Sequence, residues 1–88
     1  MNDRLRLRPD AVEWREVNGE LIALDVRSSA YFAVNRTGAS IWASLVDGAS
    51  RAELIAQLIR RFGIDEETAA RDLDAFLEQV AERDLLEQ

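Results

Sequence analysis

Hydrophobic and polar positions alternate along the first part of the chain with the period of β-strands. Residues 12–17 (VEWREV) send successive side chains to opposite sides, which predicts a half-buried strand. Asn18-Gly19 favours a type I′ turn and leads into the apolar run of residues 20–26. Residues 30–34 (AYFAV) are aromatic and β-branched and follow a short polar connection, so they predict a third strand. The three strands are expected to form an antiparallel meander.

After the third strand, apolar residues recur three and four positions apart, as they do in amphipathic helices. Ser50 and Glu53 have the spacing of a capping box, and Asp65 is a favourable N-cap for a further helix. Gly48 and Gly63 follow apolar runs and are suited to end helices. The predicted helices span residues 37–46, 51–62 and 66–83.

Three strands followed by three helices predict an α+β fold of winged-helix-like order, with a three-stranded antiparallel sheet packed on a three-helix bundle. Because the chain has 88 residues, we expect one domain over residues 1–88. Pro9 separates the sheet from residues 1–8, which are expected to form a flexible arm. Those residues do not resemble a secretory signal and no stretch is long enough to span a bilayer, so we expect a cytoplasmic protein without a membrane partner.

The aromatic side chains fall into two groups. One group occupies apolar positions and is expected in the core: Trp14, Trp42, Phe62 and Phe76. Tyr31 and Phe32 are consecutive in a strand, so they leave opposite faces of the sheet, and we expect one in the core and the other exposed.

The composition leaves few ways to build an active site. The chain has no Cys and no His, which removes thiolate nucleophiles, the usual zinc ligands and the best proton-transfer side chain near neutral pH. Neighbouring acids such as Asp72 and Asp74 do not face each other on a helix. Neither a calcium loop nor a phosphate-binding glycine loop is present. We predict that the protein is not an enzyme and needs no metal or cofactor.

The acidic charge is concentrated in the second half of the chain. Residues 45–88 contain five Arg and eleven acids, whereas residues 1–44 contain six of each, so the second half accounts for the whole net charge of -6. Such a surface repels a phosphate backbone, and nucleic acid is therefore not an expected partner.

The predicted third helix is apolar along two stripes. One contains Ala69, Leu73, Phe76 and Val80, and the other contains Ala70, Leu77 and Ala81. One stripe must face the core, whereas the second either packs in the core as well or borders a groove. The spacing alone leaves both possibilities open.

Several local motifs occur in an order that resembles a known family. They are the run VNRTGASIW at residues 34–42, the Asp47-Gly48 helix end, the Glu53-Leu54-Ile55 helix start, and Asp72 with Phe76-Leu77. In this order the chain resembles the PqqD-like family of peptide-modification chaperones, the RiPP recognition elements, over about residues 9–87. Residues 20–25 read ELIALD where the pyrroloquinoline-quinone branch of the family has a charged stretch. The stand-alone length and the strand pair LDVRSSAYFAVN at residues 24–35 are more similar to the leader-binding proteins of lasso-peptide pathways.

The resemblance implies that the leader segment of a ribosomally made precursor peptide adds as an antiparallel strand to the third predicted strand. A separate leader peptidase and a cyclase would then act on the bound precursor. The resemblance assigns the backbone ladder to Tyr31, Phe32, Ala33 and Val34, and the groove floor to Val26 and Ala33. It assigns the groove wall to Leu73, Phe76, Leu77 and Val80, and the pairing of leader carboxylates to Arg27 and Arg83. Ala33 would leave room for a leader tyrosine.

Two other functions fit the order of elements. A winged-helix DNA-binding module would need exposed Arg on its recognition helix, but the longest predicted helix carries Arg71 and Arg83 among many acids. A structural subunit of an enzyme complex would bind no peptide in isolation, which separates it from a leader-binding protein.

Overall fold

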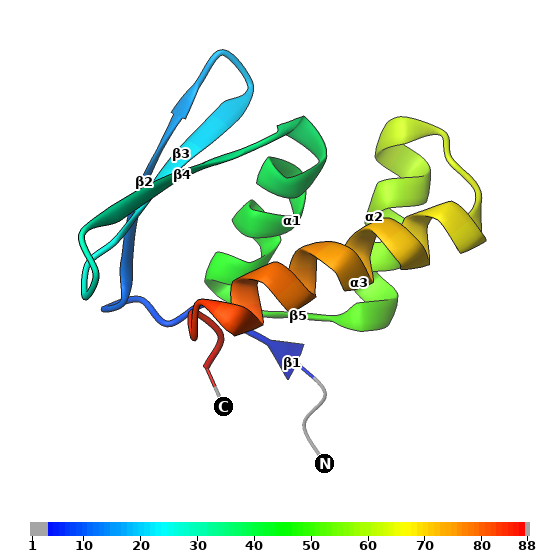
Figure 1. The fold of residues 1–88 in the computed structure, drawn as a ribbon. Helices are drawn as coiled ribbons and strands as arrows, with labels where there is room; N and C mark the ends of the chain where they lie inside the picture. Colours follow the sequence, from blue (N-terminus) through cyan, green and yellow to red (C-terminus); the bar gives the residue numbers. More distant parts are fainter. Residues whose placement is uncertain (1–3, 88) are drawn as a thin grey trace.

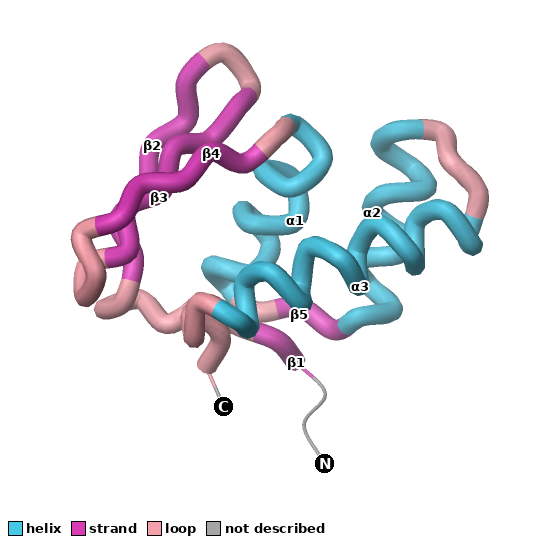
Figure 2. Tube along the Cα trace, viewed as in Figure 1, coloured by secondary structure: helices cyan, strands magenta, loops and turns pink. Residues whose placement is uncertain are grey.

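The computed structural model describes residues 4–87 and shows an antiparallel sheet beside three helices (Figures 1 and 2). The sheet has the order β2-β3-β4, formed by Val12–Val17, Glu20–Asp25 and Ala30–Val34. The helices are α1 (Arg36–Asp47), α2 (Arg51–Phe62) and α3 (Glu66–Glu82). The predicted α+β fold, with three antiparallel strands followed by three helices, is therefore confirmed. None of the helices within the described residues is long and apolar enough to cross a membrane.

Local chemistry accounts for where these elements begin and end. Asn18 and Gly19 have φ values of 54° and 83°, as the type I′ turn between β2 and β3 requires. Ser50 and Glu53 form the predicted capping box, which satisfies backbone groups at the start of α2. Asp65 caps α3 in a similar way, because its side chain accepts a hydrogen bond from a backbone N–H in the first turn.

The core lies between the inner face of the sheet and the helices, and Trp42 of α1 is fully buried within it. The rings of Trp14 and Phe32 meet Trp42 edge-on from the two outer strands, with centroid distances of 6.5 and 6.0 Å. Fully buried aliphatic side chains from the sheet, the helices and the C-terminal segment complete the core: Leu21, Ile41, Leu45, Leu54, Leu58, Leu73 and Leu85.

The prediction that Trp14 lies in the core is wrong, because 42% of its surface is exposed. It faces the helices but sits on the outer strand β2, where Trp42 covers only part of the ring. Phe62 and Phe76 are partly buried and pack against the core rather than within it.

Residues 4–8 pack on the fold and do not form the arm predicted for residues 1–8. β1 (Arg4–Leu5) pairs antiparallel with β5 (Ala49–Ser50), and Leu7 is buried where it pairs with Leu86. The alternation of Arg and Leu that looked like a loose segment is the inside-outside pattern of a strand. The part of the prediction that concerns residues 1–3 lies outside the described residues.

Candidate functional site

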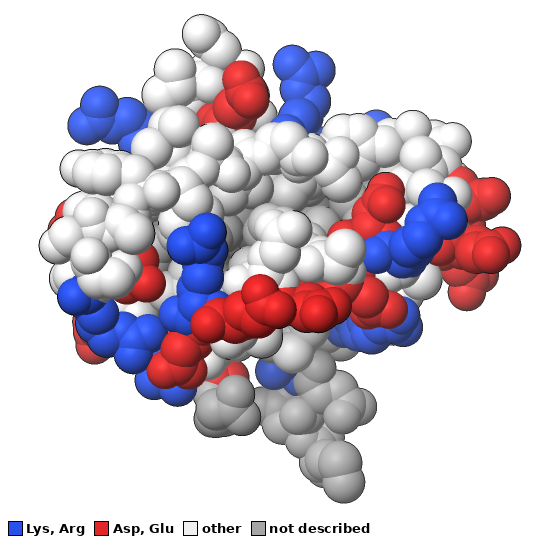
Figure 3. Space-filling view, in the orientation of Figure 1, with Lys and Arg blue, Asp and Glu red and all other residues white. Residues whose placement is uncertain are grey.

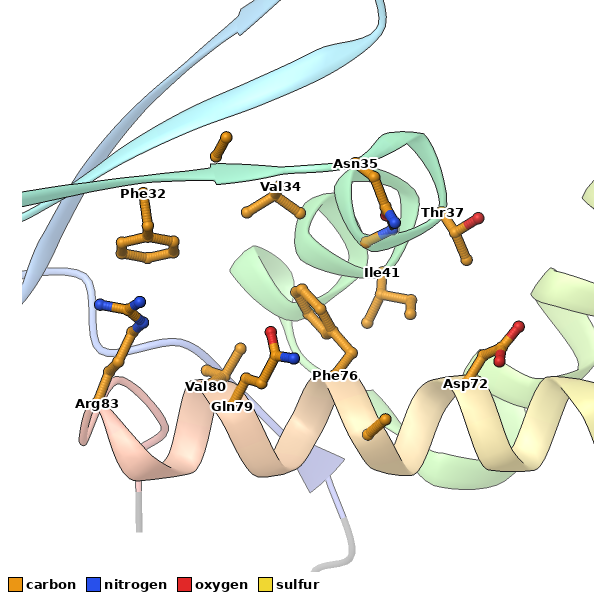
Figure 4. Close-up of a pocket in the computed structure, with 13 residues that line it drawn as sticks. Phe32, Val34, Asn35, Thr37, Ile41, Asp72, Phe76, Gln79, Val80 and Arg83 are labelled. Carbon is orange, nitrogen blue, oxygen red and sulfur yellow. Dashed lines mark hydrogen bonds between the residues drawn. The ribbon is translucent and has the colours of Figure 1, made fainter.

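A groove of about 450 Å³ lies between β4 and α3 and is closed on one side by the start of α1 (Figure 4). Figure 3 shows a hollow lined mainly by uncharged side chains, with acidic side chains along α3 below it. β4 contributes Phe32, Ala33 and Val34, and the start of α1 with the residue before it contributes Asn35, Thr37, Gly38 and Ile41. The face of α3 that borders the groove contributes Asp72, Ala75, Phe76, Gln79, Val80 and Arg83.

The strand along this groove, β4, is an edge strand that pairs only with β3. Alternate N–H and C=O groups of an edge strand have no partner in the sheet, and they can pair with a further extended chain. β4 has no charged residue, so no charged side chain discourages such pairing. An extended peptide can therefore add to this edge and place side chains in the groove.

The side chains of β4 alternate between the groove and the opposite face of the sheet. Phe32 and Val34 point toward the helices, and Val34 is 5% exposed. Tyr31 and Ala33 lie on the outer face, and Tyr31 is 73% exposed. The prediction that Tyr31 and Phe32 leave opposite faces is confirmed, and the floor of the groove is formed by Phe32 and Val34.

The start of α1 lies close to Val34 of β4 and Phe76 of α3 because residue 38 is glycine. A Cβ at Gly38 would lie 2.5 Å from Val34 Cγ1 and 2.9 Å from Phe76 Cε1, both shorter than atoms tolerate. The absence of a side chain lets the Phe76 ring reach across from α3 to the first turn of α1. Gly38 thus sets the width of the groove at its centre.

The groove has a basic end and an acidic end. The Arg83 guanidinium carbon lies 4.2 Å from the centroid of the Phe32 ring, and Asp72 lies at the other end of the groove (Figure 4). Within residues 4–87, neither charged side chain takes part in an ion pair, and no three potential metal ligands converge. The site offers apolar surface, backbone hydrogen bonds and two isolated charges, which suit recognition rather than catalysis.

Six of the eleven predicted site residues line the groove: Phe32, Ala33, Val34, Phe76, Val80 and Arg83. Ala33 does so through its backbone, and its methyl group is on the outer face, so the prediction that this methyl forms the floor is wrong. Tyr31 belongs to the same edge strand but also projects outward.

The other four predicted residues lie outside the groove. Leu73 is fully buried and Leu77 packs against the core, and neither side chain borders the groove. Val26 and Arg27 belong to the turn before β4. The Arg27 guanidinium is held by Asp84, with Nη1 lying 3.2 Å from Oδ2.

Sequence reasoning missed the contributions of α1 and part of those of α3. Asp72, Ala75 and Gln79 are spaced three or four residues from Phe76 or from each other, so a helical projection centred on Phe76 could have found them. Gly38 and the other α1 residues reach the groove only through tertiary packing, which leaves no pattern in the local sequence.

Comparisons with known proteins place this groove in context. Residues 20–86 match the family profile described as Coenzyme PQQ synthesis protein D (PqqD). The structure of TbiB1 in complex with the TbiA(beta) leader peptide is 29% identical, with a TM-score of 0.84 over 93% of this chain and 94% of that one. The structure of lasso peptide synthetase B1 complexed with the leader peptide is 28% identical, with a TM-score of 0.81 over 96% and 98% of the two chains. No curated protein matches the chain.

Proposed function

Because the chain belongs to the PqqD family and is a RiPP recognition element, we propose that it binds the leader segment of a ribosomally made precursor peptide. Proteins of this family are not catalysts, and neither is this chain. The leader adds to β4 as a further antiparallel strand and places alternate side chains in the groove against α3. The observation that carries this proposal is an uncharged edge strand running beside a groove that is lined mainly by uncharged side chains.

We further propose that the precursor belongs to a lasso-peptide pathway. The likeness to lasso peptide synthetase B1 and to TbiB1 extends over nearly the whole of each chain, and both of those structures hold a leader peptide. The bound precursor is then processed in the cytoplasm by a separate leader peptidase and a cyclase. The acidic row along α3 does not favour the alternative of a DNA-binding helix.

Fluorescence anisotropy of a labelled synthetic leader, taken from a short precursor peptide identified among the genes neighbouring this one, tests the proposal. We expect saturable binding with a Kd below about 100 μM, equivalent to about 5 kcal/mol, without metal or nucleotide. A scrambled leader of the same composition is the control peptide. Absence of saturable binding by the correct leader contradicts the proposal.

A pair of alanines on α3 tests whether the leader occupies the groove. Ala75 and Ala81 are both exposed, but only Ala75 lines the groove. Ala75→Trp fills part of the space and should weaken leader binding about tenfold, whereas Ala81→Trp should leave the Kd unchanged. Equal effects of the two substitutions would place the leader elsewhere.

A further inference from the structure

The two charged ends of the groove have a fixed order relative to β4. Phe32, the central residue of β4, contacts Arg83, which follows the last residue of α3. Val34, two residues later, lies beside Gly38 and Phe76, which is one helical turn from Asp72. β4 and α3 therefore run in opposite directions along the groove, with Arg83 opposite the middle of β4 and Asp72 beyond its end, below Thr37 (Figure 4).

The distance between the two charges sets a spacing on the bound strand. Asp72 and Arg83 are eleven residues apart on α3, which corresponds to about 16 Å along the helix axis. An extended strand covers about five residues over that length. Because successive strand side chains point to opposite faces, only even separations bring two side chains to the same groove. Two leader residues that meet these charges are therefore four or six positions apart.

We infer that the groove selects a leader segment with a cationic residue followed, four or six residues later, by an anionic residue. This inference rests on the proposed function. A strand antiparallel to β4 runs parallel to α3, so its earlier residues pass Asp72 and its later residues pass Arg83. The Arg83 guanidinium is held face-on to Phe32, and the hydrogen bonds it can donate remain available to a carboxylate.

Other charged side chains near the groove do not reproduce this order. Arg36 is directed toward Gly19, with its guanidinium 3.4 Å from where a Cβ would lie. Asp84 binds Arg27 and Arg8. Glu78 and Glu82 are exposed on α3 but do not line the groove, and they attract cationic peptides without regard to residue order.

Selection from a displayed random library of peptides about twelve residues long, enough to exceed the groove at both ends, tests the inference. Among bound peptides, basic-then-acidic pairs at separations of four or six should exceed acidic-then-basic pairs about threefold to tenfold, as expected for two partly exposed ion pairs. The two orders have the same net charge, so the general attraction to acidic α3 cancels from this ratio.

The double substitution Asp72→Arg with Arg83→Glu should reverse the preferred order. Both side chains are exposed, and circular dichroism confirms that the variant folds. The matched control, Arg71→Glu with Glu78→Arg, exchanges charges at exposed α3 positions outside the groove and should leave the preference unchanged.

The outcomes separate this inference from the function on which it rests. Binding peptides without an order preference, or with the acidic residue first, overturn the inference and leave leader binding intact. A preference that survives the double substitution also overturns it, because the two named residues then do not set the order. A library that yields no binding peptides contradicts both the inference and the proposed function.

Discussion

The two edge strands of the sheet, β2 and β4, differ in how readily they can pair with a further strand. β2 carries Glu13, Arg15 and Glu16 within its six residues, and five of the six are exposed. β4 has no charged residue and runs beside the groove. Charged side chains are a common means of keeping an exposed edge from pairing with other strands. One edge is thus protected and the other is left open where a binding partner is expected.

The largest expected difference between the edges concerns the aromatic ring that each places against Trp42. Phe32→Ala and Trp14→Ala both remove a partly buried ring and should lower the free energy of unfolding by about 2 to 3 kcal/mol. Only Phe32 lines the groove, so only Phe32→Ala should also weaken leader binding, by about tenfold or more. Thermal unfolding and anisotropy on the same samples measure both effects.

Trp14→Ala serves as the internal control for lost packing against Trp42. If it weakened leader binding as much as Phe32→Ala does, the loss would reflect the shared support of the sheet rather than contact with the leader. The contrast between the two edges would then not hold.

The elements of the fold were predictable because their determinants are local. A turn pair with two positive φ values, a capping box and glycine helix ends all act within a few residues, and each is found where the sequence places it. The pairing of β1 with β5 was missed because it joins residues 4–5 to residues 49–50, and two-residue strands have too little alternation to be recognised.

The site was only partly predictable because it depends on which face of β4 and which face of α3 turn toward the groove. The segment AYFAV is apolar on both faces, so alternation could not decide whether Phe32 or Ala33 points to the helices. On α3 a single predicted apolar stripe is divided by packing, because Leu73 is fully buried whereas Phe76 lines the groove. The face that each strand or helix turns toward the groove is fixed by its contacts with other elements, so the sequence of one element does not determine it.

The next smaller effect is expected at Gly38, which brings α1 close to β4 and has no equivalent beside β2. Gly38→Ala would place a methyl group in contact with Val34 and Phe76 and should lower the free energy of unfolding by about 1 to 2 kcal/mol through overpacking. The displaced Phe76 should also reduce leader affinity, by about threefold to tenfold. Thermal unfolding and anisotropy again provide the two values.

Ala33→Leu is the matched enlargement on the other face of β4. Its added atoms extend into solvent, so neither unfolding nor leader affinity should change beyond about 0.5 kcal/mol. A marked loss of binding in this variant would mean that the leader, or a partner bound with it, also covers the outer face of the sheet.

The smallest effect is expected in acid, and it distinguishes the turns that lead to the two edges. The turn before β4 is held by Asp25, whose Oδ1 accepts hydrogen bonds from the backbone N–H groups of Arg27 at 3.1 Å and Ser28 at 3.4 Å. Burial is the largest single influence on the Asp25 pKa and raises it. The hydrogen bonds from Arg27 and Ser28 together with the charge of Arg27 outweigh burial, so the pKa is lower than the ordinary value of 3.8. The Asn18-Gly19 turn that joins β2 to β3 depends on backbone conformation and has no such carboxylate.

A carboxyl group with a lower pKa in the folded state stabilises the fold at pH values above its unfolded pKa, and this contribution disappears as the pH falls through the folded pKa. Acid below about pH 4 should therefore loosen the turn before β4 first, and leader affinity should fall before global unfolding. Asp25→Asn retains an acceptor oxygen but cannot titrate. The variant should therefore be less stable than the wild type near neutral pH, and the difference in their free energies of unfolding should shrink as the pH falls. Thermal midpoints between pH 7 and pH 3, with hydrogen exchange of the β4 amides, measure this convergence. If the thermal midpoints of the two proteins fall in parallel as the pH is lowered, titration of Asp25 does not control the stability of the turn. The turns beside the two edge strands would then not differ in their response to pH.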